Sequence, residues 1–219
     1  MAKPQPAEIK RTAPRLYLVT PPVGEPGAFA SSLASALGAA DVAAVLLRLK
    51  PDAERALINR VKALAAVTQS TGAALLLDKE ADIAARAGAD GAHLTGIEAF
   101  MAVNGSLQPA RVAGCGGLNT RHDAMSAAER GADYVMFGEP DADGSRPSFG
   151  AIVERVEWWA EVFEVPCVAF AATIDEIAPL AAAGADFIAV GGPIWDDDRG
   201  PAAAVAEAAS RLANPEAVA

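Results

Sequence analysis

Two basic residues, Arg48 and Lys50, stand two positions apart at the end of an apolar run, and this spacing could create an anion site. Side chains two positions apart on a β-strand share one face of the strand. Two cations on one face attract a phosphate or another anion. Arg48 and Lys50 are therefore candidate anion-binding residues, with a solvated strand end as the alternative.

Polar, charged and glycine residues follow the later apolar runs as well. They are Asp78 and Lys79 after 73–77, Glu98 after 91–94, Asn119 after 111–115, Glu139, Ser145 and Arg146 after 134–138, Thr173 after 166–170, and Gly191 and Gly192 after 187–190. His93 lies inside its run, and we expect it to be a packed, hydrogen-bonded histidine rather than a catalytic base. These residues would form one site if the ends of the runs meet.

The sequence Gly-Ala-Asp occurs three times, at 88–90, 131–133 and 184–186, each time after an alanine-rich stretch and before a short apolar run. Glycine directly after a helix adopts a positive φ at little steric cost. Short, continuously apolar runs are typical of buried parallel strands. The irregular spacing indicates repeated helix–strand units of one fold rather than a solenoid of fixed period.

The pattern predicts eight strands that alternate with helices. The predicted strands are 16–20, 42–49, 73–77, 91–94, 111–115, 134–138, 166–170 and 187–191, and the predicted helices are 27–37, 52–70, 81–86, 120–130, 149–163, 174–183 and 201–212. Eight such units favour an α/β fold, a single (β/α)8 TIM barrel. If the two weaker strands, 16–20 and 111–115, did not form, a six-stranded open sheet would be the alternative. In a barrel the site lies at the carboxyl ends of the strands, and the last two loops often bind phosphate.

Composition limits the classes of function. The chain has 219 residues, of which 52% are hydrophobic, and a net charge of −10, so we expect a mobile tail at 1–14 and one barrel domain at 15–219. The negative charge argues against nucleic acid or an anionic membrane as a partner. We expect no membrane span and no signal peptide, and hence a cytoplasmic protein. Cys115 and Cys167 are expected to be reduced core residues.

Four segments together resemble the thiamine phosphate synthase and thiazole tautomerase superfamily. They are Leu-Tyr-Leu-Val-Thr at 16–20, Leu-Arg-Leu-Lys at 47–50, the stretch 84–94 that ends Gly-Ala-Asp-Gly-Ala-His-Leu, and Gly-Ala-Asp-Tyr-Val-Met-Phe-Gly at 131–138. The similarity extends from about residue 15 to 195 and implies a TIM barrel. It also implies an enzyme that joins a pyrimidine diphosphate to a thiazole phosphate and releases pyrophosphate, with Mg²⁺ and basic groups holding the departing anion.

The resemblance assigns roles to residues of this chain. Phosphate or pyrophosphate would be held by Arg48, Lys50 and Arg146, magnesium by Asp78 and Glu98, and the phosphorylated substrates by Asn119, Ser145, Thr173, Gly191 and Gly192. Members of this superfamily often pair, so the resemblance also suggests a homodimer.

The chain departs from the family pattern at several of these positions. Leu46 replaces a glutamine before the basic pair, Asp78-Lys79 replaces Asn-Asp, Gly117-Leu118-Asn119 replaces Ser-x-His, residues 143–146 replace Thr-x-Thr-Lys, and 171–174 replace a Gly-Gly-Ile turn. Lys79 thus stands where a magnesium ligand is expected, and its ammonium group could neutralise Asp78 or Glu98 instead.

These departures leave open whether the chain is an enzyme. The alternative to a synthase is a diverged, non-catalytic barrel that binds a phosphorylated metabolite or a protein partner. A thiazole tautomerase is the weaker third hypothesis, because no histidine follows 134–138 and Glu139 would have to serve as the base.

Overall fold

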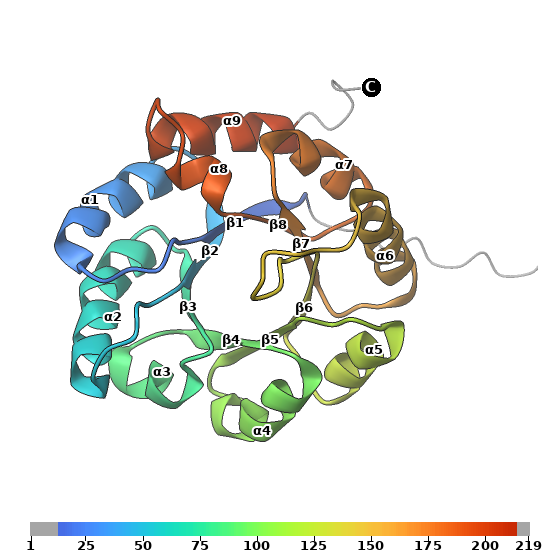
Figure 1. The fold of residues 1–219 in the computed structure, drawn as a ribbon, viewed down its shortest axis with the longest axis horizontal. Helices are drawn as coiled ribbons and strands as arrows, with labels where there is room; N and C mark the ends of the chain where they lie inside the picture. Colours follow the sequence, from blue (N-terminus) through green and yellow to red (C-terminus); the bar gives the residue numbers. More distant parts are fainter. Residues whose placement is uncertain (1–12, 214–219) are drawn as a thin grey trace, which may run out of the picture.

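The structure, a computed structural model that describes residues 13–213, is a closed barrel of eight parallel strands (Figure 1). The strands are β1 (Arg15–Val19), β2 (Val42–Leu47), β3 (Ala74–Asp78), β4 (Gly91–Thr95), β5 (Val112–Gly116), β6 (Tyr134–Phe137), β7 (Cys167–Ala171) and β8 (Phe187–Val190). They follow chain order around the barrel, and β8 pairs with β1, so no strand edge is left open. The predicted TIM barrel is confirmed, and both weaker strands form as β1 and β5.

Helices surround the barrel on its outer side (Figure 1). They are α1 (Pro26–Leu37), α2 (Glu54–Gln69), α3 (Ala81–Ala87), α4 (Ile97–Leu107), α5 (Arg121–Glu129), α6 (Phe149–Val162), the 3₁₀ turn η1 (Ile174–Glu176) with α7 (Ile177–Ala182), α8 (Gly192–Trp195) and α9 (Pro201–Ala213). No helix within 13–213 is both long and apolar enough to cross a membrane. Residues 1–12 of the predicted tail and 214–219 lie outside the described residues.

Two helices, α4 and α8, were not predicted by the sequence pattern. Only Phe100 and Leu107 of α4 are buried, and its interior contains Asn104 and Gly105, so both its apolar period and its helix propensity are weak. Helix α8 is a single turn of four residues. Both helices therefore depend on tertiary packing rather than on a strong local signal.

The repeated Gly-Ala-Asp sequences fasten β4, β6 and β8 to the strands before them. The three glycines have φ of 77°, 87° and 96°, so the helix ends and the chain turns toward the next strand. Each aspartate then accepts a hydrogen bond from a backbone N–H at the start of the neighbouring strand. The pairs are Asp90 with Leu75 (2.7 Å), Asp133 with Ala113 (2.8 Å) and Asp186 with Cys167 (2.8 Å). These residues stabilise the barrel and lie away from its carboxyl end.

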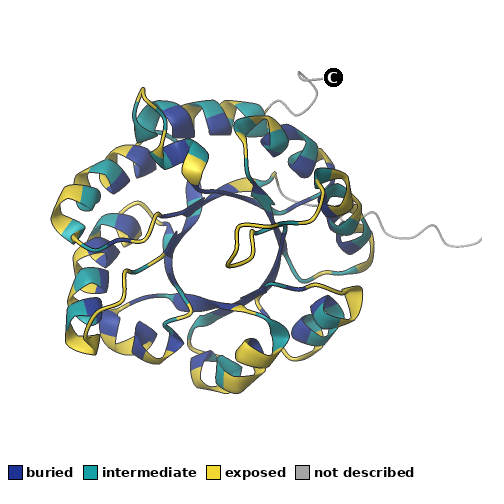
Figure 2. Cartoon of the chain, in the orientation of Figure 1, coloured by how far each residue is buried: buried dark blue, intermediate teal, exposed yellow. Residues whose placement is uncertain are grey.

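The core has two parts, one between strands and helices and one inside the barrel. Figure 2 shows that the strands are mostly buried and that the helices are buried where they face the strands. Because both faces of each strand are covered, the strands are apolar without alternation. Inside the barrel, the hydroxyl groups of Tyr17 and Tyr134 lie 2.9 Å apart. Cys115 and Cys167 are buried free cysteines, as predicted, and burial together with the charge of Glu139 raises the pKa of the Cys115 thiol to about 12.

Candidate functional site

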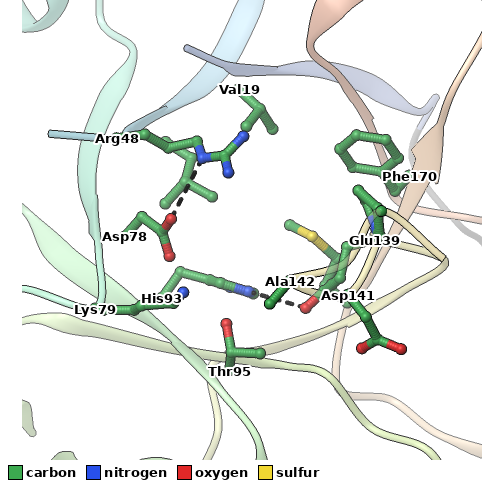
Figure 3. Close-up of a pocket in the computed structure, with 14 residues that line it drawn as sticks. Val19, Arg48, Asp78, Lys79, His93, Thr95, Glu139, Asp141, Ala142 and Phe170 are labelled. Atoms are coloured by element: carbon green, nitrogen blue, oxygen red, sulfur yellow. Dashed lines mark ion pairs between the residues drawn. The ribbon is translucent and has the colours of Figure 1, made fainter. Parts of the chain in front are cut away.

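A cavity of about 380 Å³ lies at the carboxyl ends of the strands, which is large enough for a small substrate. Its apolar walls and charged rim are shown in Figure 3. The lining residues are Val19, Leu46, Arg48, Asp78, Lys79, His93, Thr95, Met136, Glu139, Pro140, Asp141, Ala142, Gly144 and Phe170. Two are basic and three are acidic, so the lining itself carries no excess of positive charge.

Arg48 and Asp78 face each other across the ends of β2 and β3. Arg48 Nε lies 3.5 Å from Asp78 Oδ2, and the arginine side chain is 47% exposed, so its remaining N–H groups are accessible to a ligand. The backbone N–H of Arg48 donates to Thr20 Oγ1 at 3.0 Å, which ties the end of β2 to the end of β1. Arg48 is thus an accessible cation held at the rim of the cavity.

Lys50 does not line this cavity, although the strand spacing predicts that it shares a face with Arg48. Its aliphatic chain packs against Gly24, where an added Cβ would lie 3.1 Å from Lys50 Cδ. Its backbone carbonyl accepts a hydrogen bond from Arg60 Nη1 at 2.9 Å. Of the predicted pair of cations, Arg48 therefore lies at the cavity rim, whereas Lys50 packs against the segment after β1.

Lys79 has a left-handed backbone, with φ of 73°, and it is the one non-glycine residue within 13–213 that has a positive φ. Such a conformation is unfavourable for a residue with a side chain and is often found at functional sites. Its N–H donates to the carbonyl of His93 at 2.9 Å, and its exposed side chain lines the cavity. In the described part of the chain Lys79 forms no ion pair with Asp78 or Glu98, so its ammonium group is open to a ligand.

A chain of polar groups passes from the barrel interior to the floor of the cavity. Tyr17 contacts Tyr134 through the hydroxyl groups, and Tyr134 Oη lies 2.9 Å from His93 Nδ1. His93 Nε2 lies 3.5 Å from Glu139 Oε1 (Figure 3). Burial raises the pKa of both tyrosines well above the usual value, so both hydroxyls keep their protons at neutral pH. His93 is buried and hydrogen-bonded, as predicted, and it also lines the cavity.

Glu139 is seated by two glycines at the end of β5. Its Oε1 accepts a hydrogen bond from the N–H of Gly117 at 2.6 Å. A Cβ at Gly116 would lie 2.1 Å from the same oxygen, so only glycine leaves room for this carboxylate. Sequence reasoning considered Glu139 as a base but did not place it beside His93. The adjacent glycines at 116 and 117, unusual at a strand end, were the available signal.

Arg146 forms an ion pair with Glu176 and does not line the cavity. Its Nη1 lies 3.0 Å and 3.3 Å from the two carboxylate oxygens, and Glu176 Oε2 also accepts from the N–H of Ala172 at 2.8 Å. This pair ties the segment between β6 and α6, which crosses the barrel opening in Figure 1, to the turn after β7. Ser145 lies in the same segment, where its N–H and hydroxyl group donate to Asp143 Oδ1 at 2.9 Å and 2.7 Å.

The remaining predicted residues lie around the cavity in separate places. Asn119 lines a small hollow of about 60 Å³, and Glu139 is also part of its lining. Thr173 and Gly192 line an open hollow between the last two loops, together with two acidic residues, Asp196 and Asp197. Gly191 is buried before α8, and Glu98 is exposed in the first turn of α4, outside the cavity lining.

The two predicted magnesium ligands are therefore not gathered into one cage. Within the described residues no group of three or more histidine, cysteine, aspartate or glutamate side chains could hold a metal ion. Asp78 alone of the predicted pair lines the cavity, with a side chain that is 17% exposed. Magnesium is commonly held by one or two carboxylates together with the phosphate oxygens of a substrate. Asp78 fits that arrangement, in which the substrate supplies most of the ligands.

The fold and the cavity define a (β/α)8-barrel protein whose candidate site is a charged, substrate-sized cavity at the carboxyl ends of the strands. This is the position at which enzymes of this fold carry out their chemistry. The chain belongs to the thiamine monophosphate synthase family, whose family model matches residues 16–194.

Curated relatives are similar over nearly the whole chain. The thiamine-phosphate synthase of Rhodospirillum centenum is 43% identical over 196 residues, which cover 88% of this chain and 95% of that protein. The thiamine-phosphate synthase of Hyphomonas neptunium is 39% identical over 206 residues and covers 89% of this chain and 92% of that protein. The similarity therefore extends over most of the chain and over nearly the full length of both relatives.

Solved structures agree on the fold. The thiamine phosphate pyrophosphorylase from Pyrococcus furiosus has a TM-score of 0.76 at 22% identity and covers 92% of this chain and 96% of that one. The orotidine 5′-phosphate decarboxylase from Pyrococcus horikoshii has a TM-score of 0.63 at 18% identity and covers 90% of this chain and 99% of that one. At these identities the likeness concerns the barrel alone.

Proposed function

We propose that this protein is a thiamine-phosphate synthase, a transferase of thiamine biosynthesis that joins a pyrimidine diphosphate to a thiazole phosphate. In this reaction the bond between the pyrimidine methylene carbon and the diphosphate oxygen breaks, and its electron pair leaves with pyrophosphate. The thiazole ring nitrogen forms the new bond to that carbon. The observation that carries the proposal is the accessible guanidinium of Arg48 at the cavity rim, in a chain 43% identical to a thiamine-phosphate synthase.

The basic residues would bind the departing anion. Arg48 and Lys79 are the cations that line the cavity, and electrostatic stabilisation of a leaving group is most effective in such a partly enclosed site. Lys50, beside the rim, would contribute longer-range attraction. Arg146 would reach a phosphate only after exchanging its contact with Glu176 for one with the ligand.

Magnesium fits the proposal as part of a metal–diphosphate complex. The cavity lining has two basic and three acidic side chains, so a diphosphate needs a further cation to be bound there. When bound, the ion would neutralise charge on the departing pyrophosphate. Asp78 would hold it on the protein side, and Glu98 stays a predicted ligand that lies outside the cavity lining.

The second phosphate would lie between the loops after β7 and β8. Thr173 and Gly192 share the open hollow there, and Gly191 precedes it. Loops at this position of a barrel commonly bind phosphate through backbone N–H groups. Asn119 and Ser145 stay predicted substrate contacts. A cytoplasmic location and a homodimer also stay predictions.

Turnover tests the proposal directly. The purified protein is incubated with the aminopyrimidine diphosphate, the thiazole phosphate and magnesium, and thiamine phosphate and pyrophosphate are quantified. We expect equal amounts of both products, no turnover when magnesium is chelated, and a loss in kcat/KM of about 10- to 100-fold for Arg48→Ala, because charged hydrogen bonds are lost.

Arg121→Ala is the matched control, because Arg121 is also an exposed arginine paired with a carboxylate, Glu154, but lies on the outer helices. It should leave kcat/KM unchanged. If the wild-type protein forms no thiamine phosphate yet binds pyrophosphate, the synthase is refuted and the non-catalytic, phosphate-binding barrel is supported.

A further inference from the structure

The carboxylate of Glu139 is a buried acceptor that lacks a full set of donors. Oε1 accepts from the N–H of Gly117, whereas Oε2 is buried and has no hydrogen-bond partner among residues 13–213. A carboxylate has acceptor positions for about four hydrogen bonds, and leaving a buried acceptor unpaired is costly. The structure thus leaves one carboxylate oxygen at the floor of the cavity without an N–H or O–H donor.

Among residues 13–213 no lysine or arginine forms an ion pair with Glu139. Arg155 lines the small hollow beside Glu139, but its guanidinium donates to the backbone carbonyls of Leu118 and Asn119 at 2.8 Å and 3.2 Å. The basic residues of the cavity, Arg48 and Lys79, follow β2 and β3, whereas Glu139 follows β6 on the other side of the barrel (Figure 3). Its ion-pair partner among residues 13–213 is His93, whose Nε2 lies 3.5 Å from Oε1, which is too long for a good hydrogen bond. A ligand in the cavity can supply the missing donor, because Glu139 also lines the cavity.

The orientation of His93 adds a second recognition group beside the first. When the Tyr134 hydroxyl donates to His93 Nδ1, the imidazole proton resides on Nε2, the nitrogen nearest Glu139. Tyr17 in turn donates to Tyr134 and completes the chain. His93 then offers an N–H and Glu139 an acceptor oxygen, side by side at the cavity floor.

We propose that Glu139, with His93 beside it, recognises the amino-substituted edge of the pyrimidine substrate. This edge has an exocyclic N–H that donates to Glu139 and an adjacent ring nitrogen that accepts from His93. The thiazole substrate carries no N–H group on its ring, so it cannot supply the donor. Leu46, Met136 and Phe170 provide apolar walls for a flat ring. The inference rests on the proposed synthase function.

The fit requires only a small movement of the carboxylate. The last side-chain torsion of glutamate has a broad range, so the group can turn toward a donor while Glu139 stays anchored to Gly117. Its side chain is 15% exposed and lines the cavity, so a ligand can approach it. Glu139 is therefore a specificity-determining residue rather than a ligand of the metal.

The first test changes the ligand and leaves the protein intact. Binding of the aminopyrimidine diphosphate, of its analogue with hydrogen in place of the amino group, and of pyrophosphate is measured by calorimetry with magnesium. We expect the amino compound to bind about 10- to 100-fold more tightly than the analogue, because a hydrogen bond to a charged acceptor is lost.

The second test combines this comparison with Glu139→Gln and Glu139→Ala. Glutamine keeps an oxygen for the Gly117 N–H but puts an NH₂ group where an acceptor is needed, so it should remove the preference for the amino compound. Pyrophosphate binding should be unchanged in both variants, which shows that the cavity is still folded. Asp141→Asn is the control, because Asp141 is another carboxylate of the lining and should leave the preference intact.

The outcomes separate this inference from the proposed function. If the amino compound is turned over and both Glu139 variants still prefer it to the analogue, the inference is wrong and the synthase stands. If the wild-type protein binds pyrophosphate but neither pyrimidine compound, the proposed function fails and the inference fails with it. Loss of the preference with pyrophosphate binding retained supports both.

Discussion

Replacing Gly116 by alanine is expected to damage the barrel and the candidate site together. The new Cβ would lie 2.1 Å from Glu139 Oε1 and 2.6 Å from its Cδ, far inside the distance that real atoms adopt. Gly116 does not have a positive φ, so the effect is steric and does not arise from backbone strain. The carboxylate must move away from Gly117.

The magnitude comes from the displaced carboxylate. The overlapped atoms are the far end of a flexible side chain, so the overlap itself is relieved at little cost when that side chain swings aside. Separating the Glu139 carboxylate from the Gly117 N–H removes a charged hydrogen bond, and we expect the free energy of unfolding to fall by about 1.5–3 kcal/mol.

Urea unfolding followed by circular dichroism measures this change, with Gly105→Ala as the matched control. Gly105 is exposed in α4, and an added Cβ meets no atom within 4 Å. Because alanine is the better helix former, the control should raise the free energy of unfolding by about 0.5–1 kcal/mol. The reasoning is refuted if Gly116→Ala unfolds within about 0.5 kcal/mol of the wild type, the range expected of an inconsequential surface change.

Three further changes test other contacts. Asp133→Ala leaves the N–H of Ala113 unpaired and should lower the free energy of unfolding by about 1–3 kcal/mol. Asp133→Asn keeps an acceptor oxygen and should recover most of that loss. Equal losses for the two variants in urea unfolding would contradict the role of this hydrogen bond. Lys79→Gly should raise the free energy of unfolding by about 1 kcal/mol, because glycine adopts this left-handed backbone without strain. The same change should weaken pyrophosphate binding in calorimetry. A loss of stability would refute the inference that the Lys79 backbone is strained. Hydrogen bonds from Arg199 lower the pKa of Asp197 to about 2, so the contact stabilises the fold above the ordinary aspartate pKa and is lost as the pH falls through about 2. In Arg199→Ala the Asp197 titration, followed by NMR, should move up toward the ordinary value, and an unchanged midpoint would rule out this cause.

Most of the architecture could be predicted from local patterns. The three Gly-Ala-Asp sequences combine a glycine that ends a helix with an apolar run that begins a buried strand, and all three occupy those positions. Helix α4 could not be predicted in this way. It buries only Phe100 and Leu107 and contains Asn104 and Gly105, so its stability comes from packing on β4 and β5.

The site was less predictable because charges close in sequence diverge in space and distant ones meet. Arg48 lines the cavity, but Lys50, two residues away, packs beside Gly24. Arg146 was predicted to hold phosphate, and the fold places it against Glu176, thirty positions along the chain, which neutralises its charge. Side-chain spacing along one strand cannot specify which loop lies opposite.

The sequence by itself therefore determined the helix–strand repeats, the barrel they close into and the family to which the chain belongs, because glycine conformations and apolar runs act locally. Only the tertiary structure decided which polar groups share the cavity. Glu139 follows β6, Gly117 follows β5 and His93 lies within β4, and the register of the closed barrel brings them within hydrogen-bonding range or close to it. That placement depends on contacts between segments far apart in the chain, which no local pattern encodes.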